Sequence, residues 1–141
     1  MFRYFTISEA NEALPDVAQK FREVVERRVA IKGIERRLQE ALASGERQNN
    51  SDGGNVQAYM EIKQELNAAV TKLYRSIEVL EATGVSLKGL DEGLVDFPSK
   101  RFDEDVWLCW KAGETEIKFW HDTDSGFMGR KPIEVSDESL V

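Results

Sequence analysis

The residues best suited to chemistry lie near the C-terminal end of the chain, among aromatic side chains. Asp96, Cys109 and His121 belong to the residue types that bind metal ions or transfer protons, and the chain has one cysteine and one histidine. Asp122 and Asp124 follow the histidine closely. Carboxylates and an imidazole could hold a divalent cation, to which a thiolate would add a soft ligand.

The strand pairing that the sequence predicts separates two of these residues. Two β-prone runs, 106–110 and 115–121, flank a four-residue turn that contains glycine, which predicts a β-hairpin. Because Cys109 and His121 then fall on opposite faces, we predict no Cys–His nucleophilic pair. The same separation, and the small number of histidine and cysteine ligands, lead us to predict no bound metal ion, and we expect no cofactor. One face would carry Val106, Leu108, Trp110, Ile117, Phe119 and His121, and the other Trp107, Cys109, Glu116, Lys118 and Trp120.

Structural roles explain the histidine and the cysteine at least as well as chemical ones. We expect His121 to be a partly buried imidazole that forms a hydrogen bond with a backbone carbonyl or with Asp96, because buried polar groups are normally paired. Free cysteine is among the most buried residue types. Its tryptophan neighbours should keep the thiol of Cys109 protonated.

Residues 107–120 include three tryptophans, a heavy aromatic load for a small sheet. Packing against the helices is the favoured explanation. The functional alternative is an aromatic-walled pocket in which Arg130 binds an anion, because its planar fork suits carboxylate or phosphate and the glycines of 126–132 allow close backbone approach. Arg130 could equally form ion pairs with the acidic stretch 103–105.

We therefore predict a binding site formed by Asp96, Trp110, His121 and Arg130, with no catalytic residue. The favoured hypothesis is a non-enzymatic binding or interaction protein that holds a small anionic ligand or a peptide at the aromatic β end. The alternative is a metal-dependent hydrolase that uses Asp96 and His121. The single histidine and the absence of a P-loop, HExxH or GxSxG motif favour the first.

Two long helices are predicted to precede this segment. Thr6-Ile7-Ser8-Glu9 is typical of a capping box and predicts a short helix that ends near Leu14. Pro15 should open the long helix at a bend, and apolar residues at three- and four-residue steps extend it to about Ser44. A polar, glycine-rich connection, 44–54, leads to a second helix from about Asn55 to Ala82.

Short β-prone runs follow the helices. Val85–Leu87 and Gly93–Phe97 are predicted strands, the second ended by Pro98. The fold class is therefore α+β, a long antiparallel helical hairpin followed by a small antiparallel β-sheet. We predict a single domain over 1–141, with the hairpin over about 7–83, the β segment over about 84–133 and a frayed tail, 134–141.

Composition excludes several classes of function. The chain of 141 residues has a formal net charge of -7, which disfavours binding to nucleic acid. No apolar run is long enough to span a membrane, and the N-terminus lacks the pattern of a signal peptide. With a single cysteine and no internal disulfide, we expect a cytoplasmic protein.

Apolar side chains beside the seam between the predicted helices indicate self-association. Val25, Val29, Val56 and Met60 flank this seam and need cover. A two-helix hairpin buries only the seam itself, so we expect a homodimer built through the long helices. The alternative is a monomer in which the seam suffices.

Segments along nearly the whole chain resemble one known family. They are Tyr4-Phe5-Thr6, Glu9-Ala10-Asn11, Leu14-Pro15, Gly93 to Pro98, Leu108 to Trp110, Gly113-Glu114, Trp120-His121, Gly126-Phe127 and Gly129-Arg130. In order and spacing this pattern resembles the DUF2203 family. The resemblance implies a stand-alone prokaryotic-type domain with its signature residues concentrated in the β end, and it implies no particular activity.

Overall fold

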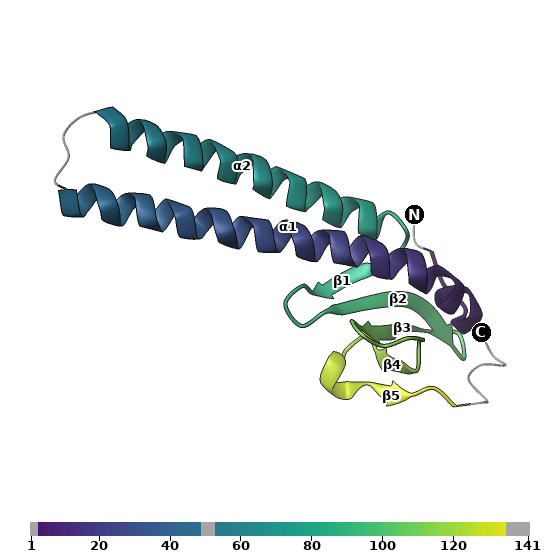
Figure 1. The fold of residues 1–141 in the computed structure, drawn as a ribbon. Helices are drawn as coiled ribbons and strands as arrows, with labels where there is room; N and C mark the ends of the chain where they lie inside the picture. Colours follow the sequence, from purple (N-terminus) through teal and green to yellow (C-terminus); the bar gives the residue numbers. More distant parts are fainter. Residues whose placement is uncertain (1–2, 49–52, 135–141) are drawn as a thin grey trace. The chain divides into compact units, whose positions relative to one another are not determined.

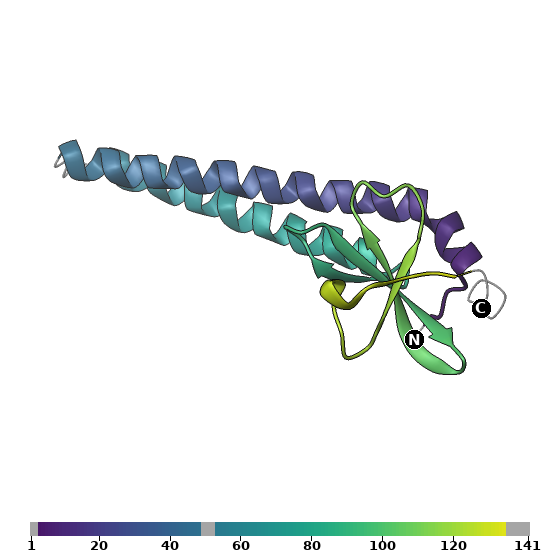
Figure 2. The ribbon, with the colours of Figure 1, turned by 90° about the horizontal axis from the view of Figure 1, so that it is seen from below.

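The chain has the predicted α+β fold, in which two antiparallel helices pack against each other and an antiparallel sheet follows (Figure 1 and Figure 2). The computed structural model describes residues 3–48 and 53–134. Helix α1 spans Ile7–Gln48 and α2 spans Gly53–Glu81. The predicted connection over 44–54 is therefore helical at both ends, and its centre, 49–52, lies outside the described residues, as does most of the predicted tail.

Helix α1 begins at the predicted capping box. The amide of Glu9 donates to Oγ1 of Thr6 over 3.0 Å, and Oε1 of Glu9 accepts from the amide of Thr6 over 2.9 Å. The predicted break at Pro15 is wrong, because α1 continues through it. The apolar stripe is uninterrupted on both sides of the exposed proline, so tertiary packing of that stripe overrides the lost backbone hydrogen bond. Its buried members here are Ala10, Leu14, Val17 and Phe21.

Residues 22–76 form one of two compact units and consist of the greater part of both helices. The buried seam includes Val24, Ile31, Ile34 and Leu73. Across it, both guanidinium NH2 groups of Arg37 donate to the carboxylate of Glu65, over 2.9 and 3.0 Å. Apolar side chains also remain exposed on this unit, among them Val25, Val29, Val56 and Met60.

The second compact unit comprises residues 1–21 and 77–141, and its described part contains the sheet. The strands are β1 (Ser86–Gly89), β2 (Leu94–Arg101), β3 (Glu104–Lys111), β4 (Phe119–Asp122) and β5 (Lys131–Pro132), in that spatial order with antiparallel pairing throughout. A 3-10 turn, η1, spans Phe127–Gly129.

Strand β2 continues beyond the proline that was expected to end it. Pro98 pairs with Trp107, and its carbonyl accepts from the amide of Phe5 over 2.7 Å. The last residue of β2 that pairs with β1 is Asp96. Pro98 therefore lies beyond the part of β2 that pairs with β1. No carbonyl of β1 needs its amide hydrogen, so a proline is tolerated at this position.

One face of the sheet packs against the N-terminal part of α1 and forms the core of this unit. The ring of Phe21 meets that of Trp110 edge-on with centroids 5.8 Å apart, and Phe5 meets Phe97 in the same way at 5.1 Å. Ser99 on this face donates to the buried carbonyl of Phe5 over 2.6 Å. We call this the helix face of the sheet and the opposite side its outer face.

The β3–β4 hairpin has a different register from the predicted one. Trp107 pairs with His121 and Cys109 with Phe119. The observed register is displaced by an odd number of residues, and such a displacement moves every side chain of one strand to the other face. The cause is a longer connection, in which Ile117 is buried and its amide donates to Oδ1 of Asn11 over 2.7 Å.

Candidate functional site

Three buried side chains with chemical potential meet on the outer face. Asp96 on β2 pairs directly with Cys109 on β3, and His121 on β4 lies two residues beyond the partner of that cysteine. One oxygen of the carboxylate, the thiol sulfur and one ring nitrogen all lie within 4.8 Å of one another. Each residue is at most 3% exposed. The expected separation of Cys109 from His121 is therefore wrong, because the register places both on one face.

The imidazole of His121 has defined partners on both nitrogens. Nε2 lies 2.8 Å from Oδ2 of Asp96, and Nδ1 lies 2.9 Å from the backbone carbonyl of Asp122. A carbonyl only accepts, so Nδ1 carries a proton. The short contact at Nε2 then requires one further proton, which the imidazole and the carboxylate share. Both structural partners that the sequence suggested for His121, a carbonyl and Asp96, are present.

Burial governs the electrostatics of this cluster. Desolvation is the largest effect on Asp96 and raises its pKa above the ordinary value. His121, the thiol of Cys109 and Lys88 lower that pKa by smaller amounts. Burial, reinforced by the negative charge of Asp96, raises the pKa of the Cys109 thiol from 9.0 to about 12. The thiol is therefore protonated near neutral pH. Oδ1 of Asp96 is buried and accepts no hydrogen bond from the residues that the structure describes.

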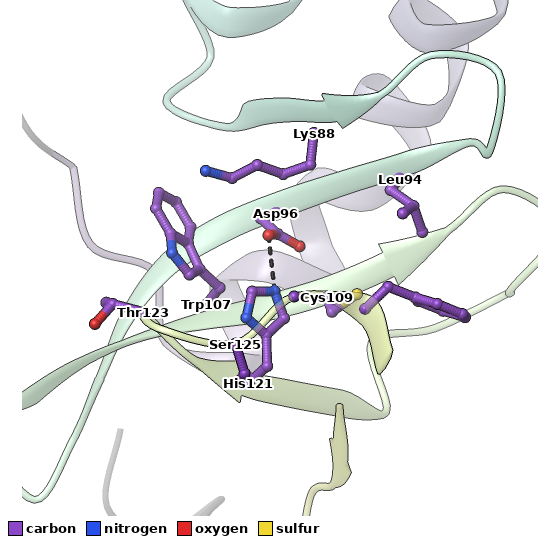
Figure 3. Close-up of a pocket in the computed structure, with 10 residues that line it drawn as sticks. Lys88, Leu94, Asp96, Trp107, Cys109, His121, Thr123 and Ser125 are labelled. Carbon is purple, nitrogen blue, oxygen red and sulfur yellow. Dashed lines mark hydrogen bonds and ion pairs between the residues drawn. The ribbon is translucent and has the colours of Figure 1, made fainter. Parts of the chain in front are cut away.

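Asp96, Cys109 and His121 form the base of a cavity of about 130 Å³ (Figure 3). The Nζ atom of Lys88 lies 4.1 Å from the centre of the Trp107 ring, so the two side chains form a cation–π contact at its wall. The remaining lining combines apolar and small polar side chains. They are Leu94, Thr123, Ser125, Gly126 and Phe127.

Two of the four predicted site residues do not line this cavity. Trp110 is on the helix face, where it packs against Phe21 and donates from Nε1 to the carbonyl of Glu114 over 2.8 Å. It is a core residue, as the favoured structural interpretation of the tryptophans held. Asp96 and His121 are the members of the predicted set that the fold brings together.

Arg130 is engaged by other partners. Its NH2 group lies 2.9 Å from each carboxylate oxygen of Glu114, and its guanidinium stacks on Phe119 and Phe127, at 3.8 and 4.7 Å from the ring centres. It also donates to the carbonyl of Cys109 over 3.4 Å. An acidic partner was one sequence-based alternative, but that partner is Glu114 and not the stretch 103–105.

Sequence reasoning did not identify Lys88 or Trp107 as site residues. No motif surrounds Lys88, and its role arises because β1 lies beside β2 and directs the lysine over the ring of Trp107. Trp107 was expected on the same face as Cys109, which is correct. It was one of the three tryptophans of the alternative aromatic pocket, but it was not among the four predicted site residues. Cys109 was recognised as a possible ligand and set aside on the register argument that the structure overturns.

The fold and the site define a two-helix α+β protein with a buried Asp–Cys–His cluster on the outer face of its sheet. The chain belongs to the family described as "Uncharacterized conserved protein (DUF2203)", whose model matches residues 3–133. No curated protein and no solved structure matches the chain. None of the helices within the described ranges is both long and apolar enough to cross a membrane.

Proposed function

We propose that this protein is a non-enzymatic binding protein that takes a small anion into the cavity on the outer face of the sheet. The observation that carries the proposal is the position of Lys88 at the wall of a small cavity with a buried base. A volume of about 130 Å³ suits an anion of a few heavy atoms.

The charges around the cavity support an anionic ligand. Among the lining residues that the structure describes, the formal charges are those of Lys88, Asp96 and His121. Because Asp96 and His121 share one proton, the pair contributes no net charge in either of its two forms. Lys88 therefore leaves the cavity with one net positive charge, and the low local dielectric strengthens its attraction for an anion.

This proposal keeps the predicted kind of ligand but changes the residue that recognises it. Arg130 was expected to bind the anion, yet its guanidinium is already paired with Glu114 and stacked on two phenylalanines. Releasing it would leave the Glu114 carboxylate without its cation. Lys88 carries no such ion pair among the described contacts, and it points along the cavity wall in Figure 3.

Isothermal titration calorimetry with acetate, nitrate and inorganic phosphate tests the proposal. At least one of these anions should bind the wild type, and Lys88→Met should abolish the binding while keeping the apolar stem over Trp107. The matched control is Lys63→Met, which removes a lysine that also lies over an aromatic ring, Tyr59, at 5.6 Å. Failure of all three anions to bind, or equal binding by Lys88→Met, would contradict the proposal.

A metal-dependent hydrolase that uses Asp96 and His121 is the second candidate. The observation in its favour is that Cys109 and His121 share a face, so the three groups can meet at one point. Its test is hydrolysis of an activated ester such as p-nitrophenyl acetate by zinc-loaded protein. Turnover that disappears in His121→Ala would favour the hydrolase, and a rate equal to that of free zinc would exclude it.

We also propose a homodimer built through the long helices and a cytoplasmic location. Val29 is 62% exposed and Val56 63% exposed, a large apolar area for a helical surface. Light scattering over a concentration series should give twice the chain mass of 16.0 kDa for the wild type. Val29→Glu should lower the mass toward that of the monomer, whereas a monomer at every concentration would refute the dimer.

A further inference from the structure

We propose that Asp96, Cys109 and His121 bind one zinc ion at the base of the cavity. A carboxylate oxygen, a thiol sulfur and a ring nitrogen already lie within 4.8 Å of one another. Zinc with ligands at about 2.0 to 2.3 Å in tetrahedral geometry separates its ligand atoms by about 3.3 to 3.7 Å. The cluster therefore reaches this geometry through small side-chain shifts, in which the Asp96–His121 contact of 2.8 Å opens slightly.

The orientation of His121 suits a metal ligand. Its Nδ1 donates to the carbonyl of Asp122, which fixes the ring and leaves the lone pair of Nε2 directed at Asp96. Ligating histidines usually make this kind of hydrogen bond through their second nitrogen, because it sets the tautomer and raises the basicity of the ligating one. The ion would occupy the place of the proton that now joins Nε2 to Oδ2.

An unpartnered atom in the cluster independently points to a ligand. Asp96 is 2% exposed, and its Oδ1 accepts no hydrogen bond from the described residues. A buried carboxylate oxygen without a partner is costly. A water held on a cation that Oδ2 binds could donate a hydrogen bond to it.

The protons and charges balance when zinc enters. Zn²⁺ forms bonds to Oδ2, Sγ and Nε2, and two protons leave, one from the Asp96–His121 pair and one from the thiol of Cys109. The cluster is neutral before and after the exchange, so no net charge is buried. The thiolate selects for zinc over magnesium or calcium, because those two ions prefer oxygen ligands.

Three protein ligands leave the fourth position of a tetrahedral ion open toward the cavity. Water fills that position when zinc is the only addition. If the anion of the proposed function binds, it can occupy the same position beside Lys88, and this last step alone rests on that function. Zinc binding itself requires neither the anion nor Lys88.

The test is calorimetric titration of zinc into untagged protein that has been purified without added metal and treated with a chelator. One ion should bind per chain. Titrations in buffers of different ionisation enthalpy should report the release of two protons near neutral pH, where both are bound in the metal-free cluster. Cobalt, used as a spectroscopic substitute, should show a thiolate charge-transfer band and the intense visible bands of tetrahedral coordination.

Cys109→Ser and Asp96→Asn should each weaken zinc binding at least tenfold, and Cys109→Ser should remove the charge-transfer band. Circular dichroism establishes that each variant is folded, and the conservative serine keeps the size of the side chain. Asp124→Asn, an exposed carboxylate near the histidine, should bind zinc as the wild type does.

Absence of zinc binding by the wild type, or unchanged binding by Cys109→Ser, would overturn the inference and leave the cluster as a structural hydrogen-bonded pair. Lys88→Met separates the two proposals. It should still bind one zinc ion per chain while it fails to bind the anion. Anion binding without zinc binding would support the proposed function and reject the metal site. Zinc binding without anion binding would support the metal site and reject the proposed function.

Discussion

Nε2 of His121 lies 2.8 Å from Oδ2 of Asp96, a residue 25 positions earlier in the chain, and both side chains are almost fully buried. The contact joins strands β2 and β4 across the intervening β3. Because the second nitrogen of His121 already donates to a carbonyl, this contact holds a proton that belongs to the pair. The consequences of removing either partner are therefore unequal.

His121→Ala should destabilise the protein more than Asp96→Asn. The alanine leaves a buried carboxylate without its partner and should lower the free energy of unfolding by about 3 to 5 kcal/mol. The asparagine can donate from its amide to Nε2 of neutral His121, so its cost should be about 1 kcal/mol. Urea unfolding near neutral pH measures both.

The control for this pair is Asp122→Asn. It changes an exposed side chain and keeps the backbone carbonyl that accepts from Nδ1 of His121. Its stability should equal that of the wild type. An Asp96→Asn variant as unstable as His121→Ala would show that the pair does not hold the shared proton inferred from its geometry.

Asn11→Ala should loosen the connection between β3 and β4. Oδ1 of Asn11 accepts from the amide of Ile117 over 2.7 Å, and its loss leaves that donor without a partner, at a cost of about 1 to 3 kcal/mol. Hydrogen exchange of the Ile117 amide should accelerate. Asn11→Asp keeps the acceptor and should protect the amide nearly as well as the wild type. Equal exchange in the alanine variant would rule out the anchoring role.

Arg130→Ala should reduce stability without affecting anion binding. The Arg130 side chain is 13% exposed, and its guanidinium pairs with Glu114 and stacks on Phe119 and Phe127, so its loss should cost about 1 to 3 kcal/mol. Thermal unfolding and anion titration check the two halves of this prediction. Lys131→Ala, which removes an exposed ion pair with Asp122, should change stability by less than about 1 kcal/mol. Loss of anion binding in folded Arg130→Ala would restore arginine as the anion-binding residue.

The thiol of Cys109 should make stability fall at alkaline pH. Its pKa is raised from 9.0 to about 12, so between these values the unfolded chain loses a proton that the folded chain retains. Because only the folded state holds this proton between the two pKa values, the free energy of unfolding falls in that pH range by up to roughly 1.4 kcal/mol per pH unit. Below the lower value the contribution is fully present.

Comparison with Cys109→Ala isolates this effect, because other groups also titrate in the alkaline range. In the presence of a chelator, the wild type should lose stability more steeply than the alanine variant between about pH 9 and pH 10.5, and the two should run parallel below about pH 8. Parallel curves over the whole range would mean that the folded thiol titrates normally.

The sequence by itself determined the local elements. The capping box at Thr6, the amphipathic stripes of both helices and the β-prone run 106–110 are encoded in neighbouring residues, and the structure contains them. Of the predicted run 115–121, only 119–121 belongs to a strand. Local rules failed at Pro15 and Pro98. At Pro15 packing of the apolar stripe offset the lost hydrogen bond, and at Pro98 strand β2 has passed the last residue that pairs with β1, so no partner on β1 needs the missing amide hydrogen.

Only the tertiary structure decided which side chains meet on the outer face. The register between β3 and β4 follows from the length of their connection, in which the amide of Ile117 donates to Asn11, 106 residues away. Because side chains alternate along a strand, an odd displacement transferred His121 to the face of Cys109. The sequence contains the aspartate, cysteine and histidine, and the pairing of β2, β3 and β4 brings them together.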